Sequence, residues 1–113
     1  MEYQIEKRQD YLLIKLSKDI TVYQLASFKE ALDRLAKIAE TNSQIIIDLK
    51  DVKFMDEFAL GILASFSRGV REMAGDVKFI HMNDDIKLIF DLTHLSKVYG
   101  IFSNLEEALI SPL

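Results

Sequence analysis

The chain has 113 residues, half of them apolar, which is enough to bury one hydrophobic core. Its net charge of −4, with acidic and basic residues interleaved, argues against nucleic-acid binding through a basic patch and against attraction to an anionic membrane. The absence of cysteine excludes disulfides and thiolate chemistry, and the absence of a long apolar run or signal peptide predicts a single cytoplasmic domain over residues 1–113 without membrane insertion.

The first part of the chain predicts a hairpin and then a helix. Residues 3–9 and 11–16 are rich in β-branched and aromatic side chains, with a polar turn around residues 8–10, as in two antiparallel strands. Thr21 and Gln24 have the spacing of a capping box, in which each side chain satisfies a backbone donor. The residues that follow recur every three or four positions and predict an amphipathic helix with the apolar face Leu25, Phe28, Ala31, Leu32, Leu35, Ile38 and Ala39.

The middle of the chain predicts a buried strand followed by a helix with an acidic start. Residues 45–49 (IIIDL) form a run that is apolar except for Asp48, as in a strand covered on both faces, so we expect this strand to be central. Asp56 has the position of an N-cap, and Glu57 adds negative charge at the positive end of the helix dipole. The helix should cover about residues 57–73, end before Gly75, and bury Ala59, Ile62, Leu63, Phe66, Val70 and Met73.

The last part continues the alternation of strands and helices. We expect strands at residues 77–82 and 97–102, and a loop at Thr41-Asn42-Ser43 before the central strand. Asn83-Asp84-Asp85 opens a helix with Ile86, Ile89, Phe90 and Leu92 inward, and a capping box of Ser103 and Glu106 opens a last helix with Leu105, Ala108 and Leu109, stopped by Pro112. The order β-β-α-β-α-β-α-β-α predicts an α/β fold with a mixed, mostly parallel sheet.

Enzymatic alternatives depend on acidic residues near the end of the central strand, Asp48, Asp51 and Asp56. Catalysis would need two of them to approach closely, whereas helix capping and turn formation explain them without chemistry. A receiver-like phosphoacceptor domain would use Asp48, but receivers need an acidic pair after their first strand, and here Asp19 stands alone. We therefore expect a protein that is not an enzyme.

Metal and nucleotide sites are not indicated. His81, expected in a strand, and His94, near a helix end, lack the spacing of metal ligands and are expected to be structural. The four glycines are scattered, so no glycine-rich phosphate loop is formed. We expect no cofactor.

A resemblance to a known family covers essentially the whole chain. Residues 45–49 and 56–61 (DEFALG) are similar to the strand and the DSSGLG motif of the STAS domain family, the anti-sigma factor antagonists. The resemblance implies the STAS fold and binding to an anti-sigma factor that is also a serine kinase. In the family this kinase phosphorylates the second serine of the motif, and that position is Phe58 here.

The sequence departs from the family where phosphorylation is concerned. Phenylalanine has no hydroxyl to phosphorylate, and the GELD-like sequence before the first helix reads Lys18-Asp19-Ile20-Thr21, with Thr21 in place of the last aspartate. Of three positions linked to phosphorylation, only Asp56 is retained. The resemblance thus implies an antagonist without the usual phosphorylation switch.

We expect the partner-binding site at this altered motif, with Thr21, Asp56, Glu57, Phe58, Ala59 and Leu60. Phe58 lies at the border of the inward helix face, so it either packs under a neighbouring loop or forms an exposed apolar pair with Leu60. The expected partner is an anti-sigma factor with kinase activity or a related regulator. A STAS subunit of a lipid-transport or stress-signalling assembly is a further alternative, and the sequence predicts no particular oligomeric state.

Overall fold

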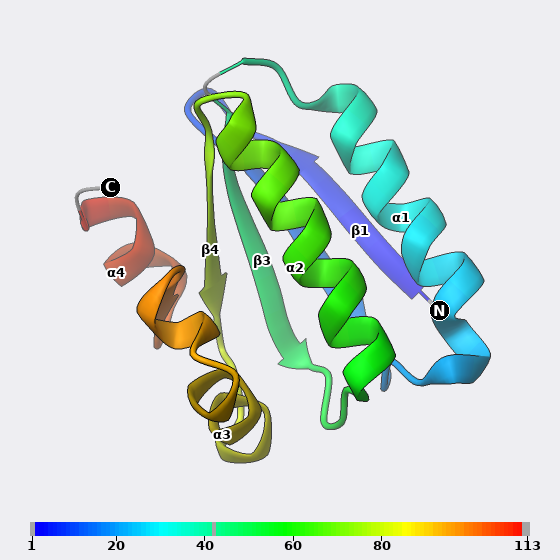
Figure 1. Ribbon diagram of the computed structural model, residues 1–113. Helices are drawn as coiled ribbons and strands as arrows, with labels where there is room; N and C mark the ends of the chain where they lie inside the picture. Colours follow the sequence, from blue (N-terminus) through cyan, green and yellow to red (C-terminus); the bar gives the residue numbers. More distant parts are fainter. Residues whose placement is uncertain (1, 42, 112–113) are drawn as a thin grey trace.

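The computed structural model describes residues 2–41 and 43–111, so Asn42 and Pro112, expected in a loop and at the end of the last helix, lie outside the described residues. In chain order the elements are β1 (Glu2–Lys7), β2 (Leu12–Ser17), η1 (Val22–Gln24), α1 (Leu25–Ile38), β3 (Gln44–Asp51), α2 (Glu57–Glu72), β4 (Asp76–Ile80), α3 (Asp84–Leu92), η2 (Leu95–Lys97), β5 (Gly100–Phe102) and α4 (Leu105–Ile110) (Figure 1). None of the helices in these ranges is long and apolar enough to cross a membrane. The predicted α/β order is confirmed.

The strands of the described ranges form one five-stranded sheet with the order β1-β2-β3-β4-β5. β1 and β2 pair antiparallel, and their turn is closed by a hydrogen bond from Arg8 N–H to the Tyr11 carbonyl at 2.9 Å. The other neighbours pair parallel, with Ile47 of β3 in register with Ile14 of β2 and Phe79 of β4. The mixed, mostly parallel sheet and the central position of β3 are confirmed.

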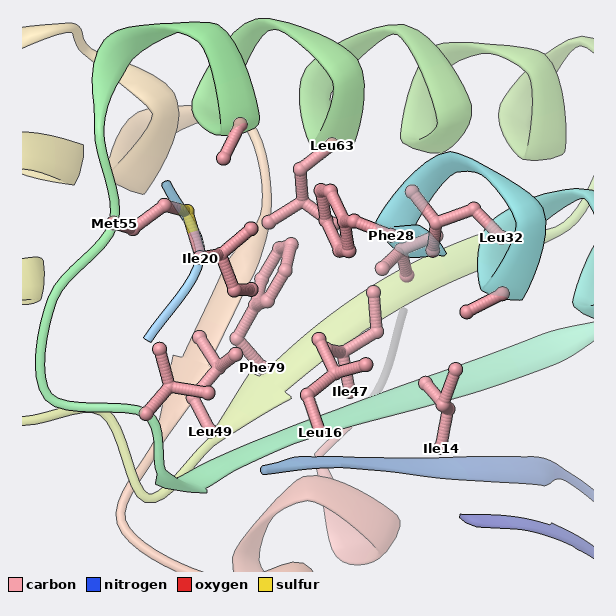
Figure 2. Packing of buried hydrophobic residues seen from close by; sticks show 14 of the residues in the cluster. Ile14, Leu16, Ile20, Phe28, Leu32, Ile47, Leu49, Met55, Leu63 and Phe79 are labelled. Carbon is pink, nitrogen blue, oxygen red and sulfur yellow. The ribbon is translucent and has the colours of Figure 1, made fainter. Parts of the chain in front are cut away.

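The two faces of the sheet are covered unequally. α1 and α2 lie side by side over one face (Figure 1), and most of the buried core lies between them and the strands. In Figure 2 the side chains of Leu16, Ile47 and Phe79 rise from the strands toward Phe28 and Leu63 of the helices. The opposite face carries a smaller buried cluster that includes α4: Leu13, Ile46, Ile80 and Ala108.

The end of α2 differs from the expectation that Gly75 breaks the helix. Ala74 has the left-handed backbone (φ 63°), its N–H donates to the Arg71 carbonyl at 2.9 Å, and Gly75 N–H donates to the Val70 carbonyl at 3.0 Å. These bonds form a Schellman motif, in which glycine usually holds the left-handed position. Gly75 is needed for another reason, because a Cβ there would lie 2.3 Å from the Ser43 carbonyl oxygen.

The predicted strand at residues 97–102 is shorter in the structure. The 3₁₀ turn η2 occupies its start, and only the three residues of β5 pair with β4. Tyr99 turns into the core, where its ring meets Phe79 edge-on with 6.3 Å between centroids, and the Arg71 guanidinium lies 4.3 Å from its ring centre. This packing, which alternation along the sequence does not encode, explains the shorter strand.

The cap of α4 is shifted by one residue from the predicted box of Ser103 and Glu106. Asn104 is the N-cap, and its side-chain oxygen accepts a hydrogen bond from Glu107 N–H at 2.9 Å. The Glu107 carboxylate in turn accepts from Ser103 N–H at 3.2 Å. The interaction has the reciprocal form of a capping box, but the prediction of its residues was wrong.

A buried lysine holds the other end of α4. Lys78 of β4 is only 8% exposed, and its Nζ donates to the carbonyl oxygens of Ala108 at 2.7 Å and Ser111 at 2.9 Å. A cation at a helix C-terminus satisfies carbonyls that have no partner within the helix and interacts favourably with the dipole. Lys78 therefore anchors α4 to the sheet.

The sequence pattern overestimates the core at the ends of helices. Four side chains that were expected inward are substantially exposed, each in the last turn or at the C-cap of its helix: Ile38, Met73, Leu92 and Leu109. Hydrophobic periodicity alone does not show where a helix extends past the elements that cover it.

Candidate functional site

The first turn of α2 is organised by Asp56, the predicted N-cap. Its backbone is extended (φ −86°, ψ 174°), and its Oδ1 accepts a hydrogen bond from Ala59 N–H at 2.9 Å. Glu57 adds a second carboxylate in the first turn. Both groups lie at the positive end of the helix dipole and stabilise this end of the helix. The N-cap prediction is confirmed.

The segment before α1 lies against the segment before α2. Ile20 forms an isolated parallel bridge with Met55, in which Ile20 N–H donates to the Phe54 carbonyl at 3.0 Å and Asp56 N–H donates to the Ile20 carbonyl at 3.1 Å. Ile20 and Met55 are both buried. Two loops that are distant in the sequence are thereby fixed side by side, and their neighbouring residues form one surface.

Side-chain hydrogen bonds make this junction more rigid. Asp19 Oδ1 accepts from the backbone N–H groups of Lys53 and Phe54, each at 3.0 Å. Thr21 and Gln24 form the predicted capping box, with Gln24 Oε1 accepting from Thr21 N–H at 3.2 Å. The Thr21 hydroxyl also donates to Gln24 Oε1, so it takes part in the cap.

Exposed apolar side chains flank the junction on both segments. We call these four residues the apolar rim: Val22, Tyr23, Phe54 and Phe58. Tyr23 is 90% exposed and Phe58 is 57% exposed, so the interpretation that Phe58 packs under a loop is wrong. Exposed aromatic side chains on a rigid backbone are typical anchors of protein interfaces.

Two predicted site residues do not reach the surface. Ala59 is fully buried and Leu60 is 6% exposed, so Leu60 forms no exposed pair with Phe58. The buried face of α2 is rotated from the predicted one because it includes Leu60, Leu63 and Ser67. Ser67 is tolerated inside because its hydroxyl donates to the Leu63 carbonyl at 2.9 Å. Counting only apolar positions missed this polar residue and so misplaced the face.

The three acidic residues considered for catalysis do not form one cluster, because Asp48 and Asp51 line the same hollow with His81 but Asp56 does not. Asp48 lies between Ile47 and Leu49 on β3, and those two side chains belong to the core under α1 and α2. Since neighbouring strand residues point to opposite faces, Asp48 faces away from α2, which Asp56 caps. Asp51 ends β3 and is exposed. Within the described residues, no three His, Asp or Glu side chains are grouped so that they could hold a metal ion.

The structure reveals an Asp–His contact that the sequence analysis missed. His81 does not continue β4 as expected but follows it with φ 58°, and its Nδ1 lies 3.0 Å from Asp48 Oδ1. Lys50 N–H also donates to this oxygen at 2.9 Å. The register of Asp48 with Ile80 could have indicated the contact, because His81 is the next residue. With these two partners, the Asp48 carboxylate does not resemble an open phosphoacceptor.

Comparison with known proteins agrees with this architecture. The family model of the STAS domain matches residues 2–108. The anti-sigma-B factor antagonist of Bacillus subtilis is 24% identical over 102 residues, which are 90% of this chain and 91% of that protein. The anti-sigma-B factor antagonist of Listeria monocytogenes is 26% identical over 98 residues, with 85% and 82% covered.

Solved structures show the same fold at low sequence identity. An anti-sigma factor antagonist from Mycobacterium paratuberculosis superposes with a TM-score of 0.83 at 19% identity and covers 96% of this chain and 90% of that one. The phosphorylated form of the Bacillus cell fate determinant SpoIIAA gives a TM-score of 0.71 at 18% identity, with 96% of both chains covered. The family match and the fold together establish that this chain belongs to the STAS domain family.

Proposed function

We propose that this protein is an anti-sigma factor antagonist that binds its partner through the start of α2 and the adjoining apolar rim. The main observation in support is that the side chain of Phe58 is 57% exposed and occupies the motif position where the family has its phosphorylated serine. The names of the curated relatives support the general role. The protein would act as a cytoplasmic binding module and not as an enzyme, with an anti-sigma factor of the kinase type as its partner.

We further propose that phosphorylation of α2 does not control this binding. Phe58 offers no hydroxyl, and the Thr21 hydroxyl is engaged with Gln24. A phosphoserine would add roughly −1.5 to −2 charges at the position of Phe58. Glu57 carries a single charge one residue earlier, about 100° around the helix, so it is a poor mimic of the phosphorylated state. The chain would therefore remain competent for binding, and its activity would follow its abundance and its affinity for the partner.

The apolar rim gives this hypothesis a physical basis. An aromatic side chain that is half exposed in the free protein gains buried area when a partner covers it, and such anchors dominate interface energies. The bridge between Ile20 and Met55 holds the two rim segments in place before binding, so little conformational entropy is lost on docking. Phe58 would thus provide a permanent contact with the partner at the position where the family has a phosphorylated serine.

The test is a pair of matched substitutions measured against the anti-sigma kinase of the same genome. Phe58→Ala should weaken binding about 30-fold, equivalent to about 2 kcal/mol. Leu92→Ala, on the 71% exposed Leu92 of α3, is the control and should change affinity less than about twofold. The free energy of unfolding of both variants should lie within about 0.5 kcal/mol of that of the parent, because both side chains are exposed. Unchanged affinity of Phe58→Ala would refute the proposed site.

A further inference from the structure

A second surface feature lies away from the apolar rim, between α1 and α2. It is an open groove with a volume of about 490 Å³, which we call the α1–α2 groove. Ile62 and Phe66 of α2 line it and remain partly exposed, and Leu32 and Val70 lie deeper. Grooves of this size with mostly apolar walls commonly bind ligands or helices. None of the residues of the apolar rim lines it.

The groove is kept open by a glycine that the fold does not require. Gly69 lines the groove in the interior of α2, and a Cβ built on it would meet no atom within 4 Å. Glycine in a helix interior is less stable than alanine, so internal packing gives no reason for its presence. A larger side chain at this position would extend into the groove.

Three charged side chains on α1 or just after its end have no partner among the residues that the structure describes. Among the described residues, Lys29, Asp33 and Glu40 line the groove, and their side chains make no ion pair or hydrogen bond. Lys29 and Asp33 lie one turn apart on α1, whereas Glu40 follows the end of that helix at Ile38. The opposite wall of the groove runs along α2 from Ile62 to Met73, which is roughly 16 Å at about 1.5 Å per residue. A groove of this length between two helices suits a third helix better than a compact small molecule.

We propose that the α1–α2 groove binds an amphipathic α-helix of another protein. Its apolar face would cover Ile62 and Phe66, with an acidic residue facing Lys29 and a basic residue facing Asp33. Because a bound helix has the same rise per residue as α1, these two charged residues of the partner should lie four positions apart. This proposal does not depend on the proposed function, since it concerns a different surface.

The experiment uses two synthetic 18-residue helical peptides with fluorescein labels, read by fluorescence anisotropy. Both carry the same leucine stripe. One has Glu and Lys four positions apart, and the other has Lys and Glu exchanged at the same two positions. The first should bind the protein saturably, and the charge-reversed peptide should bind about tenfold more weakly or worse. Equal affinity, or no saturable binding of either peptide, would overturn the proposal.

Glycine substitutions provide the matched control. Gly69→Phe should fill the groove and weaken binding of the first peptide at least about tenfold. Gly61→Phe should leave it within about twofold, because Gly61 also has open space on α2 but does not line the groove. Circular dichroism melting should show both variants folded. Equal loss in both variants would overturn the proposal. The proposal would also be overturned if the protein self-associates and Gly69→Phe abolishes this self-association while Gly61→Phe does not, since the groove would then bind a second copy of the chain.

Discussion

Replacement of Ala74 by glycine should stabilise the protein. Ala74 is exposed and holds the left-handed position of the Schellman motif at the end of α2 with φ 63°. This conformation costs an L-residue other than glycine about 1–2 kcal/mol. Glycine removes that cost but adds unfolded-state entropy of about 0.4–1 kcal/mol. The free energy of unfolding of Ala74→Gly should therefore rise by about 0.5–1 kcal/mol.

Urea unfolding followed by circular dichroism measures this change. With a slope of about 2 kcal/mol per molar, the midpoint should rise by about 0.3–0.5 M, and the melting temperature by roughly 2–4 °C. Gly75→Ala is the matched control at the next residue. Its Cβ would lie 2.3 Å from the Ser43 carbonyl oxygen and 2.9 Å from Val70 Cγ1, so it should destabilise by about 1–3 kcal/mol. A loss of stability in Ala74→Gly would refute the left-handed assignment.

Three further substitutions test other parts of the structure. Asp56→Ala should lower the free energy of unfolding by about 1 kcal/mol through loss of the N-cap, while Asp56→Asn should retain most of it; equal losses would contradict the cap. Lys78→Met should lower the free energy of unfolding by about 2 kcal/mol and speed amide exchange in α4, because two charge-assisted hydrogen bonds to carbonyls at the C-terminus of α4 are lost. Unchanged amide exchange in α4 would show that Lys78 does not anchor this helix. A double-mutant cycle of Asp48→Ala and His81→Ala should give a coupling energy of about 1 kcal/mol, and additivity would show that the contact contributes nothing.

Local chemistry made much of the fold predictable. The run at residues 45–49, apolar at every position except Asp48, identified the central strand because a strand covered on both faces is apolar at nearly every position. Thr21, Asp56 and Asn83 were recognised as the starts of helical segments because each cap bonds a backbone N–H within three residues, and such bonds are encoded by neighbouring sequence.

Features that depend on distant segments were not predictable. The backbone of Ser43, which precedes β3, decides that Gly75 cannot carry a Cβ, and nothing near Gly75 in the sequence shows this. The exposure of Phe58 and the burial of Leu60 follow from the rotation of α2, which places a hydrogen-bonded serine, Ser67, in its buried face. The partner-binding role of the site residues therefore remains a prediction, although the structure places Thr21, Asp56, Glu57 and Phe58 at one junction.

Incubation with a cognate anti-sigma kinase and ATP tests whether α2 binds its partner without a phosphorylation switch. Phosphate incorporation and complex formation are measured in the same reaction. The triple substitution Glu57→Ser, Phe58→Ser and Ala59→Gly, which restores the family motif, serves as the control that should accept phosphate. We expect a stable complex with the parent protein and no incorporated phosphate. Phosphate on Thr21 or Ser65 that dissolves the complex would contradict this expectation.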